Sequence, residues 1–98
     1  MLTGKQRAFL RGKANSFDVI AQVGKEGLTK ACLSGLSTAL NARELIKIKV
    51  LPNSGLTARE FCDEACEALN AETIQVIGTI VVLFRKKEKD SEYDLSKL

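Results

Sequence analysis

The segment Val23–Thr29 places two glycines three residues apart, with Lys25 and Glu26 between them. A strand-like apolar run precedes it and a run with helical spacing follows from Thr29, so the glycines lie at a strand-to-helix junction. Glycine lets a ligand approach the backbone closely, and the unpaired N–H groups of a helix N-terminus favour an anion such as phosphate. The predicted phosphate-binding residues of this loop are Gly24, Lys25, Gly27 and Lys30.

The G-x-x-G spacing is shared with KH domains, whose loop clamps a nucleic-acid backbone. The segment is too short for a nucleoside-triphosphate P-loop, and the dinucleotide pattern G-x-G-x-x-G is absent. A purely structural alternative stays open, in which Gly24 ends the strand and Gly27 permits a turn.

Other basic residues recur in groups that would each share one face. Arg7 and Arg11 are four apart on a predicted helix, and Lys47 and Lys49 alternate with apolar residues on a predicted strand. If these groups converge with the loop, they form a phosphate-binding surface. With four Phe and one Tyr in the chain, recognition should depend on backbone charge and shape more than on stacked bases. The basic candidates outside the loop are Lys5, Arg7, Arg11, Lys47, Lys49 and Arg85.

The net charge of +3 is unevenly distributed along the 98 residues. Residues 1–50 hold nine Lys and Arg against three acidic residues, whereas residues 51–84 hold one against five. We therefore expect one basic and one acidic side, and a basic side suits a polyanion. A solvated, salt-bridged surface without a partner is the alternative.

The cysteines and the lack of histidine limit the possible chemistry. Cys32, Cys62 and Cys66 are odd in number, which suits a reducing compartment, and we expect buried structural thiols. Without a nucleophile–base pattern, the sequence predicts no enzyme, no metal site and no cofactor. No apolar run approaches the ~20 residues that span a membrane, and the N-terminus lacks signal-peptide features, so we expect a cytoplasmic protein without a membrane partner.

Local patterns predict three helices and four strands. Thr3 with Gln6, and Thr57 with Glu60, have capping-box spacing, so helices should begin near residues 4 and 58. Thr29 can cap a helix that runs to about residue 42. β-Branched and alternating runs predict strands over 18–23, 45–51, 73–77 and 79–84, with a turn over 52–55.

The order α-β-α-β-α-β-β predicts an α+β fold, in which a small mixed four-stranded sheet packs with three helices in two layers. We expect one monomeric domain over residues 1–86 and a charged, flexible tail over residues 87–98.

Taken together, six segments resemble the CRM domain family, RNA-binding modules of chloroplast splicing factors and of bacterial ribosome maturation. The likeness is to the stand-alone bacterial YhbY-like members, and the segments run in the family's order across residues 2–85. The segments are Leu2–Arg7, Phe9–Gly12, Gln22–Thr29, Glu44–Lys49, Gln75–Gly78 and Val82–Arg85.

The resemblance implies a fold similar to the C-terminal domain of translation initiation factor three, and RNA binding through the glycine loop and nearby basic residues. For the stand-alone bacterial members it implies association with precursors of the large ribosomal subunit. Positions that match the family's loop are Gly24, Lys25 and Gly27, and positions that match frequently basic ones are Arg7, Arg11, Lys47 and Lys49.

The chain departs from the family pattern at several positions. The loop residue Glu26 places a carboxylate beside the expected phosphate, which costs binding unless it points away or pairs with Lys25. The other departures are Asn15-Ser16 where a histidine pair is common, Val19 in place of a proline, and Thr79 in place of a basic residue.

We therefore expect a non-catalytic protein that binds ribosomal RNA of large-subunit precursors. One alternative is a factor for another RNA. A second is a protein-interaction module whose acidic helix, Glu60–Glu67, docks a basic ribosomal protein, although solvated surface is the favoured interpretation of that helix face.

Overall fold

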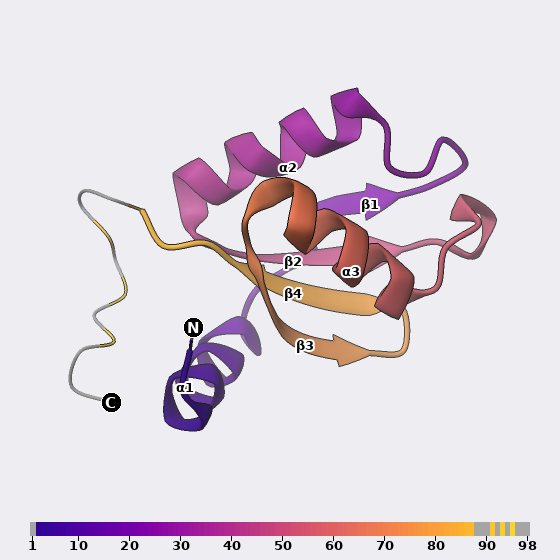
Figure 1. Ribbon diagram of the computed structural model, residues 1–98. Coiled ribbons are helices and arrows are strands. Elements are labelled where there is room, and N and C mark those ends of the chain that lie inside the picture. Colours follow the sequence, from indigo (N-terminus) through magenta and orange to yellow (C-terminus); the bar gives the residue numbers. More distant parts are fainter. Residues whose placement is uncertain (1, 88–90, 92, 94, 96–98) are drawn as a thin grey trace.

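A computed structural model of the chain describes residues 2–87, 91, 93 and 95 (Figure 1). It has three α-helices and one mixed four-stranded sheet of order β1-β2-β4-β3, in which β1 and β2 are parallel and the other neighbours antiparallel. The predicted α+β class is confirmed. The elements are α1 (Gly4–Ala14), β1 (Ala21–Val23), α2 (Lys30–Arg43), β2 (Leu45–Val50), the short 3-10 helix η1 (Pro52–Ser54), α3 (Ala58–Leu69), β3 (Glu72–Ile77) and β4 (Ile80–Phe84).

The helices begin where the sequence places capping residues. The Thr3 hydroxyl accepts a hydrogen bond from the Gln6 N–H at 3.2 Å, and the Gln6 side chain accepts one from the Thr3 N–H at 2.8 Å. Thr57 and Glu60 form the same reciprocal pair at the start of α3. These reciprocal hydrogen bonds confirm both predicted capping boxes. Each pair satisfies two backbone donors that the start of a helix would leave unpaired.

One face of the sheet is covered by α2 and α3. Leu36 and Leu40 of α2 and Phe61 of α3 are buried against Ile46 and Ile48 of the central strand β2. This side of β2 is the apolar side that the alternating sequence predicted.

The opposite face is covered by α1 over part of its length. Leu10 and Ala14 of α1 are buried with Leu45, Val82 and Phe84. The sheet therefore carries helices on both faces, which the two-layer expectation did not include. Since α1 packs at the end of β2 where Leu45 lies, Lys47 and Lys49 on the same face remain half-exposed.

The C-terminal segment contributes to the α1 side of the core. The side chains of Tyr93 and Leu95 are buried there, and the Tyr93 ring stands edge-on to Phe84 with centroids 5.9 Å apart. The buried carboxylate of Glu44 accepts hydrogen bonds from the Ser91 hydroxyl at 2.6 Å and the Lys87 N–H at 3.1 Å. At these positions the structure differs from the expected flexible tail over 87–98, because apolar side chains reach the core. Residues 88–90, 92, 94 and 96–98 lie outside the described part.

The strand ends differ from the predictions in ways that affect the surface. The first strand was expected from residue 18 but begins at Ala21, so it pairs only with the last three residues of β2. Gly78 has a φ of 56° and, with Thr79, forms the tight turn between β3 and β4. A register shift between Thr73 and Gln75 places a bulge in β3.

Candidate nucleic-acid interface

The glycine loop is a tight turn between β1 and α2. The Gly27 N–H donates to the Gly24 carbonyl at 2.9 Å, which closes a four-residue turn with Lys25 and Glu26 at its tip. Gly27 has a φ of 67°, in the left-handed region that favours glycine. Gly24 lies outside that region, so its backbone conformation does not require a glycine.

The loop delivers the chain to the N-terminus of α2. The Thr29 hydroxyl caps the helix by accepting from the Cys32 N–H at 3.0 Å. No described residue accepts from the N–H groups of Lys30 and Ala31 at the first two helical positions, and the first turn contains no acidic residue. This helix end therefore keeps the positive electrostatic potential of its dipole and two free donors.

The loop is braced by the segment that follows β2. The Leu51 N–H donates to the Val23 carbonyl at 2.9 Å. A Cβ atom at Gly24 would lie 3.6 Å from the Leu51 side chain, and one at Gly27 would lie 3.5 Å from the Ser54 carbonyl oxygen. The turn is thus held from one side, while Lys25, at its tip, is exposed.

Lys49 and Lys47 lie on the sheet surface that leads to the loop. Lys49 is opposite Gln22 in the parallel pair of β1 and β2. At about 3.3 Å per strand residue, Gln22 is about 7 Å from Gly24 along β1, and Lys47 lies about 7 Å further from the loop. The strand register therefore places Lys49 about 7 Å and Lys47 about 14 Å from the loop along the strand direction. The sequence did not single out Gln22, whose part in this surface depends on the strand register.

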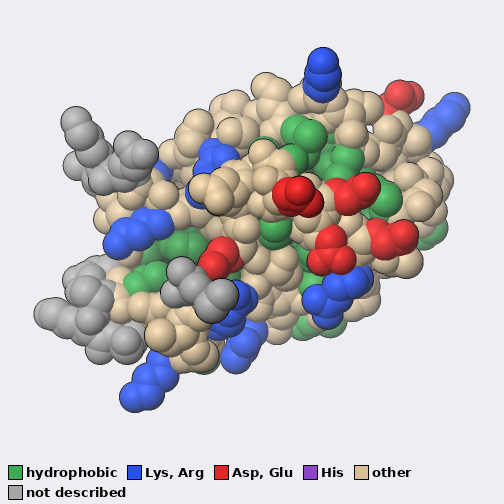
Figure 2. Space-filling view, viewed as in Figure 1, with side chains coloured by type: hydrophobic (Ala, Val, Ile, Leu, Met, Phe, Trp, Pro, Cys, Tyr) green, Lys and Arg blue, Asp and Glu red, His purple; other side chains and the backbone are tan. Residues whose placement is uncertain are grey.

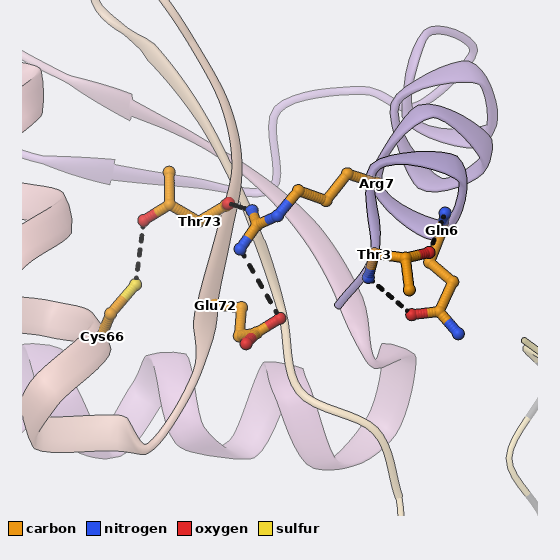
Figure 3. Close-up of polar contacts among 6 residues, drawn as sticks. All are labelled: Thr3, Gln6, Arg7, Cys66, Glu72 and Thr73. Carbon is orange, nitrogen blue, oxygen red and sulfur yellow. Dashed lines mark hydrogen bonds and ion pairs between the residues drawn. The ribbon is translucent and has the colours of Figure 1, made fainter. Parts of the chain in front are cut away.

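The guanidinium groups of Arg7 and Arg85 form hydrogen bonds with other groups of the protein and do not extend toward the loop. The Arg85 guanidinium donates to the carbonyls of Leu69 and Ser37 at 2.8 and 3.0 Å, and to the side chains of Ser37 and Asn41 at 3.1 and 2.9 Å. Arg7 donates to the Thr73 carbonyl and forms an ion pair with Glu72 at 3.9 Å (Figure 3).

These two arginines are at the far end of the sheet from the loop. Arg85 follows Phe84, which pairs with Leu45 at the start of β2, and Glu72 pairs with the same Phe84. Lys5 and Arg11 are exposed on α1, which packs at that end. The structure therefore does not bring Lys5, Arg7, Arg11 and Arg85 to the loop.

The exposed face of α3 is acidic. Figure 2 shows a group of acidic side chains where α3 faces the viewer. No ion pair among the described residues involves this group. The expected acidic side is present here, and its charge disfavours contact with a polyanion such as RNA. The exposed acidic residues of α3 are Glu60, Asp63, Glu64 and Glu67.

The thiol of Cys62 is buried and that of Cys66 is half-buried. Burial raises the pKa of the Cys62 and Cys66 thiols, and the Cys66 sulfur lies 3.1 Å from the Thr73 hydroxyl (Figure 3). In the described part of the chain no group of three or more His, Cys, Asp or Glu could hold a metal ion. None of its helices is long and apolar enough to cross a membrane.

Comparison with known proteins matches this chain to one family. Residues 2–85 match the family model of the CRS1 / YhbY (CRM) domain. The chain is 36% identical over 95 residues to the probable RNA-binding protein YqeI of Bacillus subtilis, covering 97% of this chain and 99% of that protein. It is 35% identical over 88 residues to an RNA-binding protein of Haemophilus influenzae, covering 90% and 89%.

A solved structure agrees with these matches. The solution structure of the Staphylococcus aureus protein SAV1595 superposes with a TM-score of 0.77 at 34% identity, over 96% of this chain and 98% of that one. The resemblance inferred from the six sequence segments is confirmed, and the chain belongs to the CRS1 / YhbY (CRM) domain family.

Proposed function

We propose that this protein is a non-catalytic RNA-binding protein that holds the RNA backbone at the Gly24–Gly27 loop. The observation that carries the proposal is the exposed end of α2, where two unpaired N–H groups lie beside the exposed lysines Lys25 and Lys30. A phosphate at this end would accept from the backbone and neutralise both cations. Two of the relatives are named as RNA-binding proteins, which supports RNA as the polyanion.

The strand lysines extend this contact along the sheet. Lys49 and Lys47 lie on the face that α1 leaves open, so a backbone that leaves the loop can follow them. No aromatic side chain in the described part of the chain is fully exposed, so phosphate contacts should supply more of the affinity than stacking does. Binding should therefore depend on phosphate contacts and shape, with a strong salt dependence.

Lys25→Glu tests the loop directly. Because Lys25 is exposed at the turn tip, the variant should fold normally and bind RNA roughly tenfold more weakly, with a salt slope smaller by about one phosphate contact. Lys86→Glu is the matched control: it makes the same charge change at an exposed position beyond the far end of β4. Equal losses in both variants would show that net charge, and not the loop, determines affinity.

The cellular RNA that we propose is ribosomal RNA in precursors of the large subunit. Sedimentation of a lysate at low and high salt tests this: the protein should migrate with these precursors at low salt and be released at high salt. Migration at the top of the gradient at low salt would refute stable ribosomal association and direct attention to another RNA.

A further inference from the structure

A pocket of about 400 Å³ lies where the short strand β1 leaves the edge of β2 open. β1 pairs with Ile48–Val50 only, and the Ile20 N–H donates to the Lys47 carbonyl at 3.0 Å just before the strand begins. Beyond that bond the edge of β2 at Leu45 and Ile46 has no neighbouring strand. Besides this edge, the pocket is lined by Phe17, Asp18, Ile20, Arg43, Lys47 and Tyr93.

Backbone groups of β2 face this pocket. Lys47 directs its carbonyl toward Ile20, whereas Glu44 directs its carbonyl to Arg85, beyond the end of β4 on the other side. Because successive residues of a strand alternate in direction, the N–H and C=O of Leu45 and the N–H of Lys47 point to the open edge. No hydrogen bond to these three groups is formed within the described part of the chain.

The side chains of the pocket combine apolar walls with charges of both signs. Phe17 is half-buried and Ile20 is 37% exposed, so both present apolar surface. Arg43 and Lys47 supply two cations, and neither forms an ion pair with a described residue. Asp18 supplies an exposed carboxylate. A ligand that complements this pocket would have a flat apolar group for Phe17 and Ile20, hydrogen-bond donors for Asp18, and a nearby negative charge for Arg43 and Lys47.

We propose that this pocket receives one unpaired nucleotide of the bound RNA, an inference that rests on the proposed function. Its base packs on Phe17 and Ile20, and the N–H groups of the base donate to the Asp18 carboxylate and to the Leu45 carbonyl at the open edge of β2. Arg43 and Lys47 contact the adjoining phosphates. Ile20 and Gly24 are about 13 Å apart along β1, so the pocket continues the surface that runs from the loop through Lys49 and Lys47.

The test compares two RNA hairpins that differ in one base. One carries a single unpaired adenosine in its stem, and the other carries an abasic nucleotide there, which keeps the phosphates and the bend. By fluorescence anisotropy the first should bind at least about tenfold more tightly, equivalent to about 1.4 kcal/mol. Equal affinities for the two hairpins would refute the proposal that the pocket receives an unpaired base. They would leave the proposed function intact provided that Lys25→Glu weakens both hairpins; if neither hairpin binds at low salt, both proposals fail.

Asp18→Ala separates base recognition from simple electrostatics. A carboxylate that only repels RNA would, when removed, strengthen binding to both hairpins. A carboxylate that accepts from the base would, when removed, reduce the preference for the adenosine hairpin. Asp63→Ala on α3 is the control, since it removes the same charge from an exposed site. If the two variants behave alike, the base does not contact Asp18 and the pocket assignment is wrong.

Discussion

Alanine at Gly27 and alanine at Gly24 should separate conformational strain from contact with RNA. Gly27 has a φ of 67°, a conformation that costs an L-residue roughly 1–2 kcal/mol. Its new Cβ would meet the Ser54 carbonyl oxygen at 3.5 Å, an ordinary contact, so strain dominates. The expected loss of unfolding free energy for Gly27→Ala is therefore about 1–2 kcal/mol.

Gly24→Ala should have the opposite profile. Gly24 is outside the left-handed region, and its new Cβ would meet Leu51 at 3.6 Å. Stability should thus stay within about 0.5 kcal/mol of the wild type, as for substitutions that remove no special feature. If RNA approaches the backbone at Gly24, the methyl group should weaken binding roughly tenfold, equivalent to about 1.4 kcal/mol.

Urea unfolding and RNA affinity at one fixed salt concentration measure both effects. The comparison requires the m-value to be unchanged between variants, so that a shift in midpoint reports stability. Full RNA affinity in Gly24→Ala would refute close approach at this glycine. Full stability in Gly27→Ala would refute the strain argument.

Three further predictions concern side chains away from the loop. Arg85→Ala should lower stability by about 2 kcal/mol or more in urea unfolding, because its guanidinium holds four hydrogen bonds; a stable variant that loses RNA binding would instead place Arg85 in the interface. Tyr93→Ala should cost about 3 kcal/mol in the same assay, because it empties a buried site, and an unchanged midpoint would show that the C-terminal segment contributes nothing. Cys62 and Cys66 should react with an alkylating reagent at a higher pH than a free thiol, since burial raises the pKa of both from the ordinary value of 9.0. For the same reason stability should fall as pH rises past about 9, where the unfolded chain releases these protons first; rapid alkylation at neutral pH would contradict this.

The sequence predicted best those features that neighbouring residues determine. Thr3 and Thr57 begin helices because the partner that completes each capping box is three residues away. The alternation of Ile46 and Ile48 with lysines identified the buried side of β2 for the same local reason. The glycine loop was equally visible, since the strand, turn and helix that form it are contiguous.

Long-range contacts explain what was not predicted. Arg85 looked like a surface cation, but its partners, such as Ser37 and Leu69, lie in distant helices. The first strand begins three residues later than expected, at Ala21, because its extent depends on pairing with β2, which is distant in sequence. Tyr93 lies in a charged segment, and the apolar site that buries it is formed by residues distant in sequence, on α1 and on the sheet.

The two open edges of the sheet bear on self-association. An exposed strand edge invites pairing with another chain, and short strands, bulges and charged groups at the edge oppose it. At one edge β1 is three residues long. At the other edge, β3 carries the bulge between Thr73 and Gln75. There the Arg7 guanidinium donates a hydrogen bond to the Thr73 carbonyl, so this acceptor is not available to another strand (Figure 3). By pairing with this carbonyl, Arg7 opposes edge-to-edge association of the sheet.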